Sequence, residues 1–275
     1  MLLGLNGATT MKADLATDIR VAGQAGYDVV EIWAAKLDEF LRTGTLEDVA
    51  RLLAEAGVKA HAINSIERIT FRDPAGQAEV RGRCKQLARY AQAIGCPYIV
   101  VVPSPLPEGA DSGDAWRESI AVLRELAVIV REHDVGLAFE FLGFPWCSVR
   151  TLAEAWAIVR EVDRPNVGLV MDTCHFYAGD STLESIAQMD PAKLWIFHLN
   201  DVEDVPKAEI TDAHRLLPGE GVIPLREIIR AVRAIGYNGV CSVELFRPEY
   251  WEWEPLKLAE EAKRKTEAVL RLSGV

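Results

Sequence analysis

The sequence has no basic tract, no heptad array and no low-complexity segment, and its formal net charge is −11. Because an acidic surface repels phosphate backbones, we expect no nucleic-acid partner. No segment reaches the roughly 20 apolar residues that a membrane-spanning helix needs, so we expect no membrane partner either. The apolar stretch at the N-terminus is short and follows no basic segment, which argues against a signal peptide.

Closely spaced cysteines are also missing. The five cysteines are scattered, and none belongs to a C-x-x-C pair. This argues against a disulfide framework and against a structural zinc site built from thiolates. We therefore expect reduced thiols in a cytoplasmic protein. Cys174 lies between Asp172 and His175, and we interpret it as a small side chain at a strand end rather than a reactive thiol.

Short apolar runs alternate with longer amphipathic segments along the whole chain. Apolar residues recur at helical spacing in segments such as "LREIIRAVRAIGY", and glycine-containing stops such as "LAEAGVKA" precede the next apolar run. The runs predict strands at Leu2–Asn6, Tyr27–Trp33, Lys59–Asn64, Tyr98–Val102, Gly136–Glu140, Val167–Met171, Leu194–Leu199 and Val240–Leu245.

This alternation predicts the fold class. Continuously apolar strands separated by helices are typical of a parallel sheet covered by helices. A doubly wound open sheet is the alternative, but it usually carries a glycine-rich phosphate loop after an early strand, and "GLNGATTM" matches that loop poorly. We predict an α/β fold, a single parallel eight-stranded (β/α)8 TIM barrel, in one domain over residues 1–275.

Polar side chains follow several of these strands. In such barrels the strand ends converge on one mouth, where catalytic groups lie. Three carboxylates placed there repel one another unless a cation or protons compensate them, so we expect a metal site rather than a merely acidic rim. Mn²⁺, Mg²⁺, Co²⁺ and Zn²⁺ all suit oxygen and nitrogen ligands, and Mn²⁺ is the ion we expect. The ends of the fifth to eighth predicted strands supply Glu140, Asp172, His198 and Glu244.

The motifs at these positions resemble a known family. "LAFEFLG", "MDTCH", "FHLND", "HRLLPGEG" and "SVELF" are similar to motifs of the xylose-isomerase-like barrel superfamily of sugar isomerases and epimerases, over nearly the whole chain. The resemblance implies that Glu140, Asp172, His198 and Glu244 hold one divalent metal. Within the superfamily, "HLNDVEDVP" and "SVELFRPEYW" are most similar to inosose (keto-inositol) isomerases.

The implied chemistry is proton transfer beside a carbonyl, through a cis-enediolate of a small-molecule keto-polyol. The resemblance assigns Glu140 and Glu244 as the acid/base pair, and His175 and Arg215 as residues that orient the substrate and stabilise its negative charge. Transfer between adjacent carbons makes the enzyme an isomerase. A ketose 3-epimerase, which reprotonates one carbon on its other face, and an inosose dehydratase, which eliminates a hydroxyl, remain alternatives.

Other residues near the mouth are candidates for substrate binding. Asn64 is one, and Trp33 is either a wall of the site or part of the core. Glu31 contacts either substrate or Lys36. Arg247 precedes the aromatic segment "YWEW", which covers a sugar ring or packs against a partner subunit in a possible homo-oligomer. His61, near the start of the third strand, we interpret as structural.

Two rival functions come from other classes. A metal-dependent abasic-site endonuclease shares the fold but carries additional histidines at early strand ends, where this chain has "INS" and "VVPSP". A non-catalytic sugar-binding barrel needs no complete set of metal ligands, so the four candidate ligands argue against it.

Overall fold

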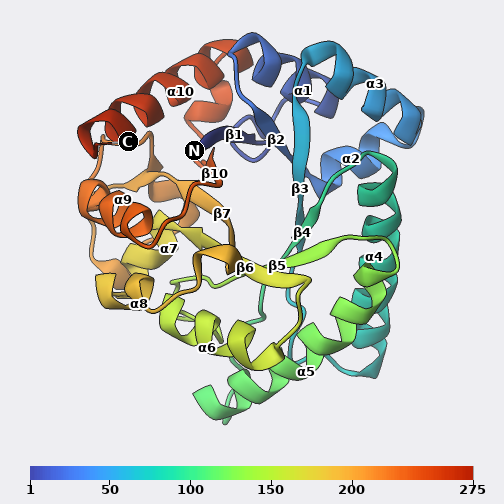
Figure 1. Cartoon of the computed structure of the whole chain (residues 1–275), viewed down its shortest axis with the longest axis vertical. Helices are drawn as coiled ribbons and strands as arrows, with labels where there is room; N and C mark the ends of the chain where they lie inside the picture. Colours follow the sequence, from blue (N-terminus) through green and yellow to red (C-terminus); the bar gives the residue numbers. More distant parts are fainter. Residues whose placement is uncertain (275) are drawn as a thin grey trace.

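A computed structural model of the chain describes residues 1–274. Eight strands close into a barrel around which the helices form an outer ring (Figure 1). Neighbouring strands are parallel throughout the barrel, in the order β1-β10-β7-β6-β5-β4-β3-β2, which confirms the predicted TIM barrel. The strands are β1 (Leu2–Asn6), β2 (Val29–Trp33), β3 (Lys59–Ile66), β4 (Tyr98–Val101), β5 (Gly136–Glu140), β6 (Val167–Asp172), β7 (Leu194–Leu199) and β10 (Val240–Val243).

The predicted strands differ from these by no more than two residues at each end. Shifts of two residues occur at β2, which begins at Val29 instead of Tyr27, at β3, which continues to Ile66, and at β10, which ends at Val243 instead of Leu245. The Asp28 carboxylate accepts a hydrogen bond from the Leu3 backbone N–H, so a side chain takes the place of a ladder bond before β2. The β3–β4 register shifts between Ile63 and Ile66, and this irregularity lets β3 extend. The apolar pattern of the sequence does not reveal the Asp28 hydrogen bond at β2 or the register shift at β3.

Local sequence signals determine where many helices begin. Thr45, Asp111 and Thr151 each form a capping box, in which the side chain accepts from the backbone N–H three residues later and the side chain of that later residue accepts in return. The α-helices are α1 (Leu15–Gln24), α2 (Ala34–Phe40), α3 (Leu46–Ala56), α4 (Pro74–Ala93), α5 (Ser112–Arg131), α6 (Leu152–Val162), α7 (Thr173–Ala178), α8 (Leu183–Ala187), α9 (Leu225–Ala234) and α10 (Pro255–Leu272).

The apolar side chains form an inner and an outer layer. The outer and larger layer lies between the strands and the surrounding helices. The inner layer fills the barrel and consists of Ala62, Val100, Val102, Ala138, Val170 and Ile196. Because side chains two residues apart lie on the same face of a strand, the inward positions of Ala138, Val170 and Ile196 place Glu140, Asp172 and His198 inward as well, one layer closer to the carboxyl end.

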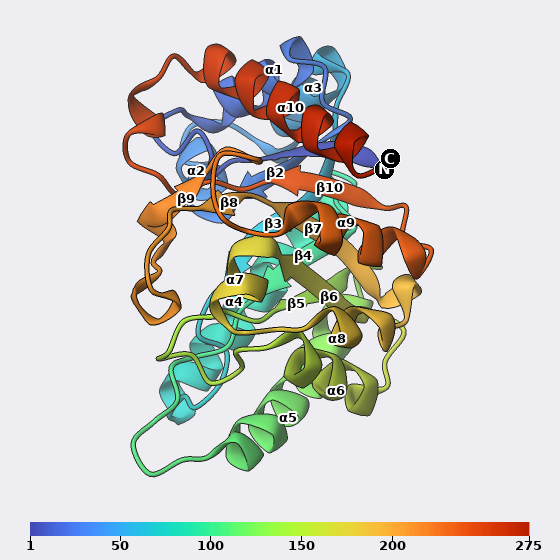
Figure 2. The same cartoon turned by 90° about the vertical axis from the view of Figure 1, so that its left-hand side faces the viewer.

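A small two-stranded sheet stands beside the carboxyl end of the barrel. It pairs β8 (Asp201–Val202) with β9 (Arg215–Leu216) in antiparallel register and lies, in Figure 2, on the side away from the two chain termini. The buried Asp201 carboxylate accepts backbone N–H groups of Gly219 and Ile223 at 3.1 and 2.9 Å. This sheet and its carboxylate hold Arg215 over the barrel.

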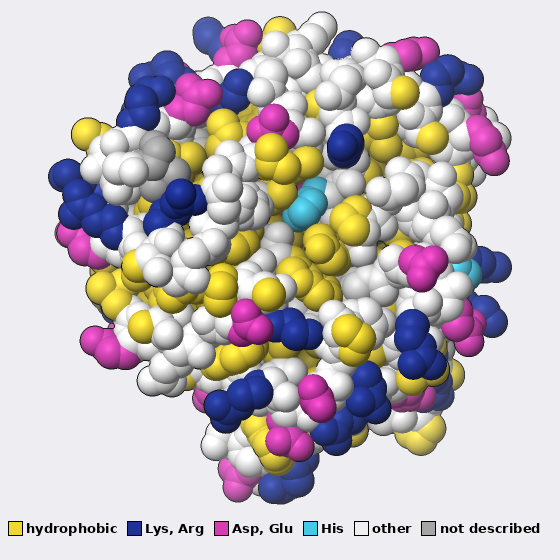
Figure 3. Space-filling model, viewed as in Figure 1, with side chains coloured by type: hydrophobic (Ala, Val, Ile, Leu, Met, Phe, Trp, Pro, Cys, Tyr) yellow, Lys and Arg dark blue, Asp and Glu magenta, His cyan; other side chains and the backbone are white. Residues whose placement is uncertain are grey.

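The surface is charged at its periphery. Figure 3 shows acidic and basic side chains spread around the edge of one face, with hydrophobic side chains toward its middle. This is the arrangement expected when amphipathic helices surround an apolar barrel. None of the helices within residues 1–274 has the length and apolar character of a membrane span.

Candidate active site

Four side chains converge above the inner apolar layer. Glu140, Asp172, His198 and Glu244 each offer one nitrogen or oxygen atom, and these atoms all lie within 4.8 Å of one another. His198 Nδ1 lies 3.1 Å from Glu140 Oε1, 3.3 Å from Glu244 Oε2 and 3.9 Å from Asp172 Oδ2. All four side chains are buried. The structure thus brings together the four residues predicted as metal ligands.

Glu31 lies beneath His198 rather than against the substrate cavity. His198 Nε2 donates to Glu31 Oε1 at 2.9 Å, and neither side chain is exposed to solvent. The expected alternative partner, Lys36, instead contacts Asp18 at 2.7 Å. The structure therefore shows Glu31 against His198 and not against Lys36, because the inward direction of its strand position places it under the imidazole. Contact between Glu31 and substrate stays a prediction. Glu31 holds the imidazole so that Nδ1 faces the other three residues.

Charge in this cluster is strongly coupled. Burial lowers the pKa of His198, but the carboxylates of Glu244, Glu31 and Glu140 outweigh it and raise the pKa well above its ordinary value. Burial likewise raises the pKa of Glu140, to about 7, against the opposing effect of His198. Without a metal, the carboxyl groups of the cluster therefore surround a protonated His198 side chain, whose positive charge offsets part of their negative charge.

The two glutamates have different surroundings. Glu244 Oε1 accepts from the side-chain amides of Asn6 and Asn64, each at 2.9 Å, and Glu244 Oε2 accepts from Arg215 at 3.2 Å. The side chain of Glu140 has one hydrogen-bond partner among the described residues, His198. Hydrogen bonds to a carboxylate stabilise its ionised form. Glu244 is therefore fixed by three side chains, whereas the Glu140 carboxylate is fixed by His198 alone among the described residues.

Asp172 is fixed from three directions. Its Oδ2 accepts from Arg215 Nη1 at 2.6 Å and from Asn200 Nδ2 at 2.7 Å, and its Oδ1 accepts from the His175 backbone N–H at 2.9 Å. Burial raises the pKa of Asp172, but the positive charge of Arg215 outweighs it and lowers the pKa to about 2. Asn200 was not among the predicted residues. Asn200 lies two residues after His198 in "FHLND", and this position in the motif was the feature of the sequence that could have identified it.

His175 lies at the wall of the site. Its Nε2 accepts from Arg215 Nη2 at 3.1 Å, so the proton of the neutral imidazole is on Nδ1, which has no hydrogen-bond partner among the described residues although it is buried. Burial lowers the pKa of His175 to about 4, which keeps the ring neutral at physiological pH. The ring packs edge-on against Phe144 at 4.8 Å. The His175 side chain also lines a cavity, to which its Arg215 partner contributes as well.

A cavity of about 230 Å³ opens above these residues. Trp33, Asn64, His175 and Arg215, which are among the candidate substrate-binding residues, all line it. The sequence analysis did not identify four other residues of the lining: Phe144, Phe246, Glu67 and Arg68. For the two phenylalanines, an aromatic residue shortly after a strand end was the only indication in the sequence. Aromatic and aliphatic side chains form part of the wall, and polar or charged side chains form the rest, a mixture that suits a small polar molecule.

Arg247 lies outside the lining of this cavity. Its Nη1 donates to Glu203 Oε1 at 2.6 Å, and its guanidinium lies over the Tyr250 ring. The structure therefore places Arg247 away from the cavity in which we expected it to bind substrate. The loop after β10 turns this side chain toward the loop after β8. Cys174 is buried, and burial raises the pKa of its thiol, which leaves it a packed, unreactive side chain.

The sequence profile of the "Xylose isomerase-like TIM barrel" family matches residues 19–269. The chain belongs to this family. It is 38% identical over 272 residues to the inosose isomerase of Bacillus velezensis, covering 98% of this chain and 97% of that protein. It is 36% identical over 268 residues to the inosose isomerase of Bacillus subtilis, covering 97% and 96%.

Among solved structures, the crystal structure of the IOLI protein with a bound zinc atom superimposes with a TM-score of 0.96. It is 36% identical to this chain, and 99% of each chain is covered. The donor set of the present site also fits a divalent ion, because three carboxylates and an imidazole nitrogen surround one point and no thiolate takes part.

Proposed function

We propose that this protein is a divalent-metal-dependent isomerase of a keto-polyol, an inosose, and that it moves a proton between adjacent carbons through a cis-enediolate. The observation that carries the proposal is the geometry of Glu140 and Glu244, two carboxylates at one buried site with different surroundings. The identity of 36–38% to inosose isomerases over nearly the full chain supports the choice of substrate.

Glu140, Asp172, Glu244 and the Nδ1 atom of His198 would hold the metal. A divalent ion polarises a substrate carbonyl and stabilises the negative charge that develops on its oxygen. We propose Mn²⁺ because the donors are oxygen and nitrogen atoms only. The zinc in the structure of the IOLI protein makes Zn²⁺ the first ion to compare with it. Mg²⁺ and Co²⁺ complete the series to be tested.

The residues divide the remaining work. Glu140 takes the proton from the carbon next to the carbonyl, since its carboxylate lines the cavity and has His198 as its one hydrogen-bond partner among the described residues. Glu140 then returns this proton to the former carbonyl carbon, while a proton passes between the two substrate oxygens; alternatively Glu244, across the site, takes a proton from a substrate hydroxyl and delivers it to that carbon. His175 and Arg215, which both line the cavity, orient the substrate, and Arg215 stabilises negative charge.

Asn64 and Trp33 position the substrate. Asn64 connects the cavity wall to Glu244 through its amide, and Trp33 forms an apolar wall with Phe246, the two ring centroids being 5.6 Å apart. A ring with hydroxyl groups at its edge and C–H groups on its face suits these two surfaces. Arg247 would act indirectly, by holding the loop that precedes Arg215 through Glu203 and the Ala213 carbonyl.

Proton NMR in D2O with scyllo-inosose tests the proposal. We expect a new keto-inositol that carries deuterium at the carbon next to the original carbonyl. An inverted hydroxyl beside an unchanged carbonyl would instead show an epimerase, and an olefinic or diketone product a dehydratase. If inosose is not converted, isomerisation of inosose is ruled out, and fructose, tagatose and psicose become the substrates to test.

The metal requires a separate comparison. Protein freed of metal is reloaded with Mn²⁺, Zn²⁺, Co²⁺ or Mg²⁺, and initial rates are compared after chelation of excess ion. We expect the highest rate with Mn²⁺. A rate without metal equal to the best loaded form would contradict the metal-dependent mechanism.

We also propose that the enzyme works in the cytoplasm. All five cysteines, which lie within the described residues, are free thiols, and such thiols persist in a reducing compartment. Assembly into a homo-oligomer stays a prediction, with the exposed Trp253 after β10 as one candidate contact.

A further inference from the structure

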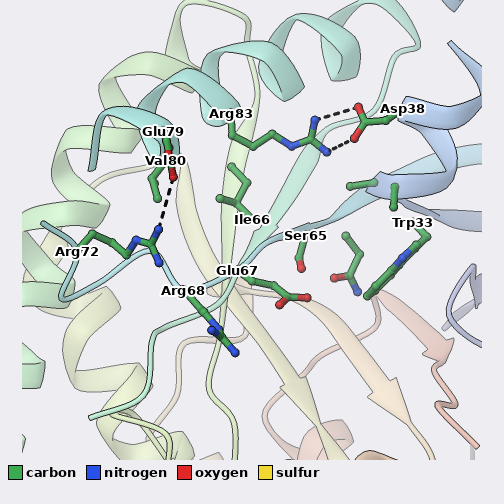
Figure 4. A pocket seen from close by; sticks show the side chains of 13 residues that line it. Trp33, Asp38, Ser65, Ile66, Glu67, Arg68, Arg72, Glu79, Val80 and Arg83 are labelled. Atoms are coloured by element: carbon green, nitrogen blue, oxygen red, sulfur yellow. Dashed lines mark hydrogen bonds and ion pairs between the residues drawn. The ribbon is translucent and has the colours of Figure 1, made fainter. Parts of the chain in front are cut away.

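A second cavity of about 370 Å³ adjoins the catalytic one (Figure 4). It lies between the start of α2, the end of β3 and the first half of α4, and we call it the side cavity. Five residues line both cavities: Trp33, Asn64, Ser65, Glu67 and Arg68. A ligand bound at Glu140 and Glu244 can therefore extend past these residues into the side cavity. Apart from the shared Trp33 and Asn64, the residues of the side cavity have no part in the reaction proposed above.

Two charged side chains stand at the boundary between the cavities. Glu67 and Arg68 are exposed, and neither has a hydrogen-bond or ion-pair partner within residues 1–274. In Figure 4 the Glu67 carboxylate points toward Trp33, and Arg68 extends away from the ion pair of Arg83 and Asp38. Unlike most charged groups around this mouth, these two have full hydrogen-bonding capacity left for a ligand.

The charge of the side cavity indicates which ligand fits. Three arginines and three carboxylates line it, so its formal charge is balanced: Arg68, Arg72, Arg83, Asp38, Glu67 and Glu79. Arg83 is neutralised by a bidentate pair with Asp38, at 2.9 and 2.6 Å. A phosphate or carboxylate would meet repulsion as well as attraction here. A neutral group rich in hydroxyls instead uses both the donors of arginine and the acceptors of the carboxylates.

We propose that the side cavity binds a neutral polyhydroxylated substituent, such as a glycosyl ring, on a keto-polyol whose carbonyl end lies in the catalytic cavity. The proposal rests on the proposed function and extends it from a free inosose to an O-glycosylated one. Ligand sites usually measure about 300–1,000 Å³. The catalytic cavity, at about 230 Å³, accommodates a single small ring, and the side cavity adds room for a second.

Titration calorimetry on the metal-loaded enzyme tests this without turnover. The probes are myo-inositol, its mono-O-glucosyl and mono-O-galactosyl derivatives with the sugar on different ring carbons, an O-methyl ether and inositol monophosphates. We expect at least one glycoside to bind about tenfold more tightly than myo-inositol, the size of effect that one additional hydrogen bond to a charged group produces. The methyl ether should show no such gain.

A substitution at Ala35 tests whether the additional affinity for a glycoside comes from the side cavity. It is an exposed residue of α2 that lines the side cavity but not the catalytic one. Ala35→Trp should fill the side cavity and abolish the gain for the glycoside while leaving kcat/KM for inosose unchanged. Glu39→Trp, on the same helix but outside both cavities, is the matched control and should keep the gain.

Three results would overturn the proposal: no glycoside binds better than myo-inositol, a phosphate binds better than every glycoside, or the gain persists in Ala35→Trp. Because calorimetry needs no conversion, these results are distinct from failure of the proposed isomerase reaction. An enzyme that binds the glycoside through the side cavity but leaves inosose unchanged would refute only the proposed function.

Discussion

The two ends of the barrel interior are built on the same strands but differ in chemistry: aromatic side chains pack at the amino end, and ionisable side chains cluster at the carboxyl end. At the amino end, the Tyr98 ring stacks on Trp195 with centroids 4.5 Å apart, and His61 packs edge-on against Tyr98 at 5.3 Å. At the carboxyl end, the same barrel carries buried acids around His198. The apolar layer of Ala62, Val100, Ala138, Val170 and Ile196 separates the two.

The aromatic end depends on glycine for its space. A Cβ atom on Gly168 would lie 2.4 Å from ring atoms of Trp195, and one on Gly136 would lie 2.7 Å from the same ring. His61 Nε2 contacts the Trp195 carbonyl oxygen at 3.1 Å, so this histidine is structural, as its position in β3 predicts. Aromatic packing therefore fills the amino end of the barrel.

The difference shows how stability and chemistry are distributed. Buried ionisable groups that face one another lower stability unless each is paired. Apolar packing at the other end and in the middle layer contributes the stabilising free energy. Substitutions at the two ends should therefore have different effects. Those at the carboxyl end should change metal binding and turnover, and those at the amino end should change the free energy of unfolding.

The largest effect is expected from Glu140→Gln. Glutamine keeps the shape of the side chain but cannot take a proton, so kcat for inosose should fall by about 10³-fold or more. The melting temperature should stay within a few degrees of wild type. Glu108→Gln, in an exposed loop, is the control and should retain full activity. Activity near that of wild type in Glu140→Gln would show that Glu140 is not the acid/base group.

Trp195→Ala, at the amino end, should affect stability and leave the metal site unchanged. Loss of the stacked ring should lower the free energy of unfolding by about 3 kcal/mol, measured by urea denaturation. At temperatures where the variant is folded, metal affinity should be that of wild type. A loss of metal affinity without loss of stability would contradict the separation of the two ends.

Glu31→Gln tests the residue that links the strands to His198. The amide side chain holds the imidazole less firmly and makes it a poorer ligand, so the dissociation constant of the metal should rise about 10- to 100-fold. The Co²⁺-loaded protein should also show shifted absorption bands. Glu31→Asp, which retains the carboxylate, should recover part of the affinity. Unchanged affinity and spectra in Glu31→Gln would mean that Glu31 has only a structural role.

The smallest effect concerns pH. Without metal, the pKa values of Glu140 (about 7) and His198 are both raised, so the site holds protons that the metal must displace. Apparent metal affinity should therefore weaken as pH falls below 7, by about tenfold per pH unit for each displaced proton, and strengthen as pH rises toward 8. Calorimetry in two buffers with different ionisation enthalpies measures the protons released. Release of none between pH 6 and 8 would contradict this account.

Much of the fold and part of the site were predictable from the sequence. Strand periodicity, glycine stops and capping residues are local patterns, so the barrel and its strands followed from them. The polar residue at the end of each strand also identified the convergence of Glu140, Asp172, His198 and Glu244. The roles of Glu31, Asn200 and Arg247 were not predictable, because each depends on a partner in another strand or loop.

What the sequence alone determined is which side chains stand at the carboxyl ends of the strands, since that follows from a period of two along each strand and from parallel connection. Only the tertiary structure decided that Glu31 lies under His198, that the two glutamates differ in their hydrogen bonds, and that the side cavity joins the catalytic one. Such features depend on strand register and loop path. Both result from packing between segments far apart in the chain, which no local pattern encodes.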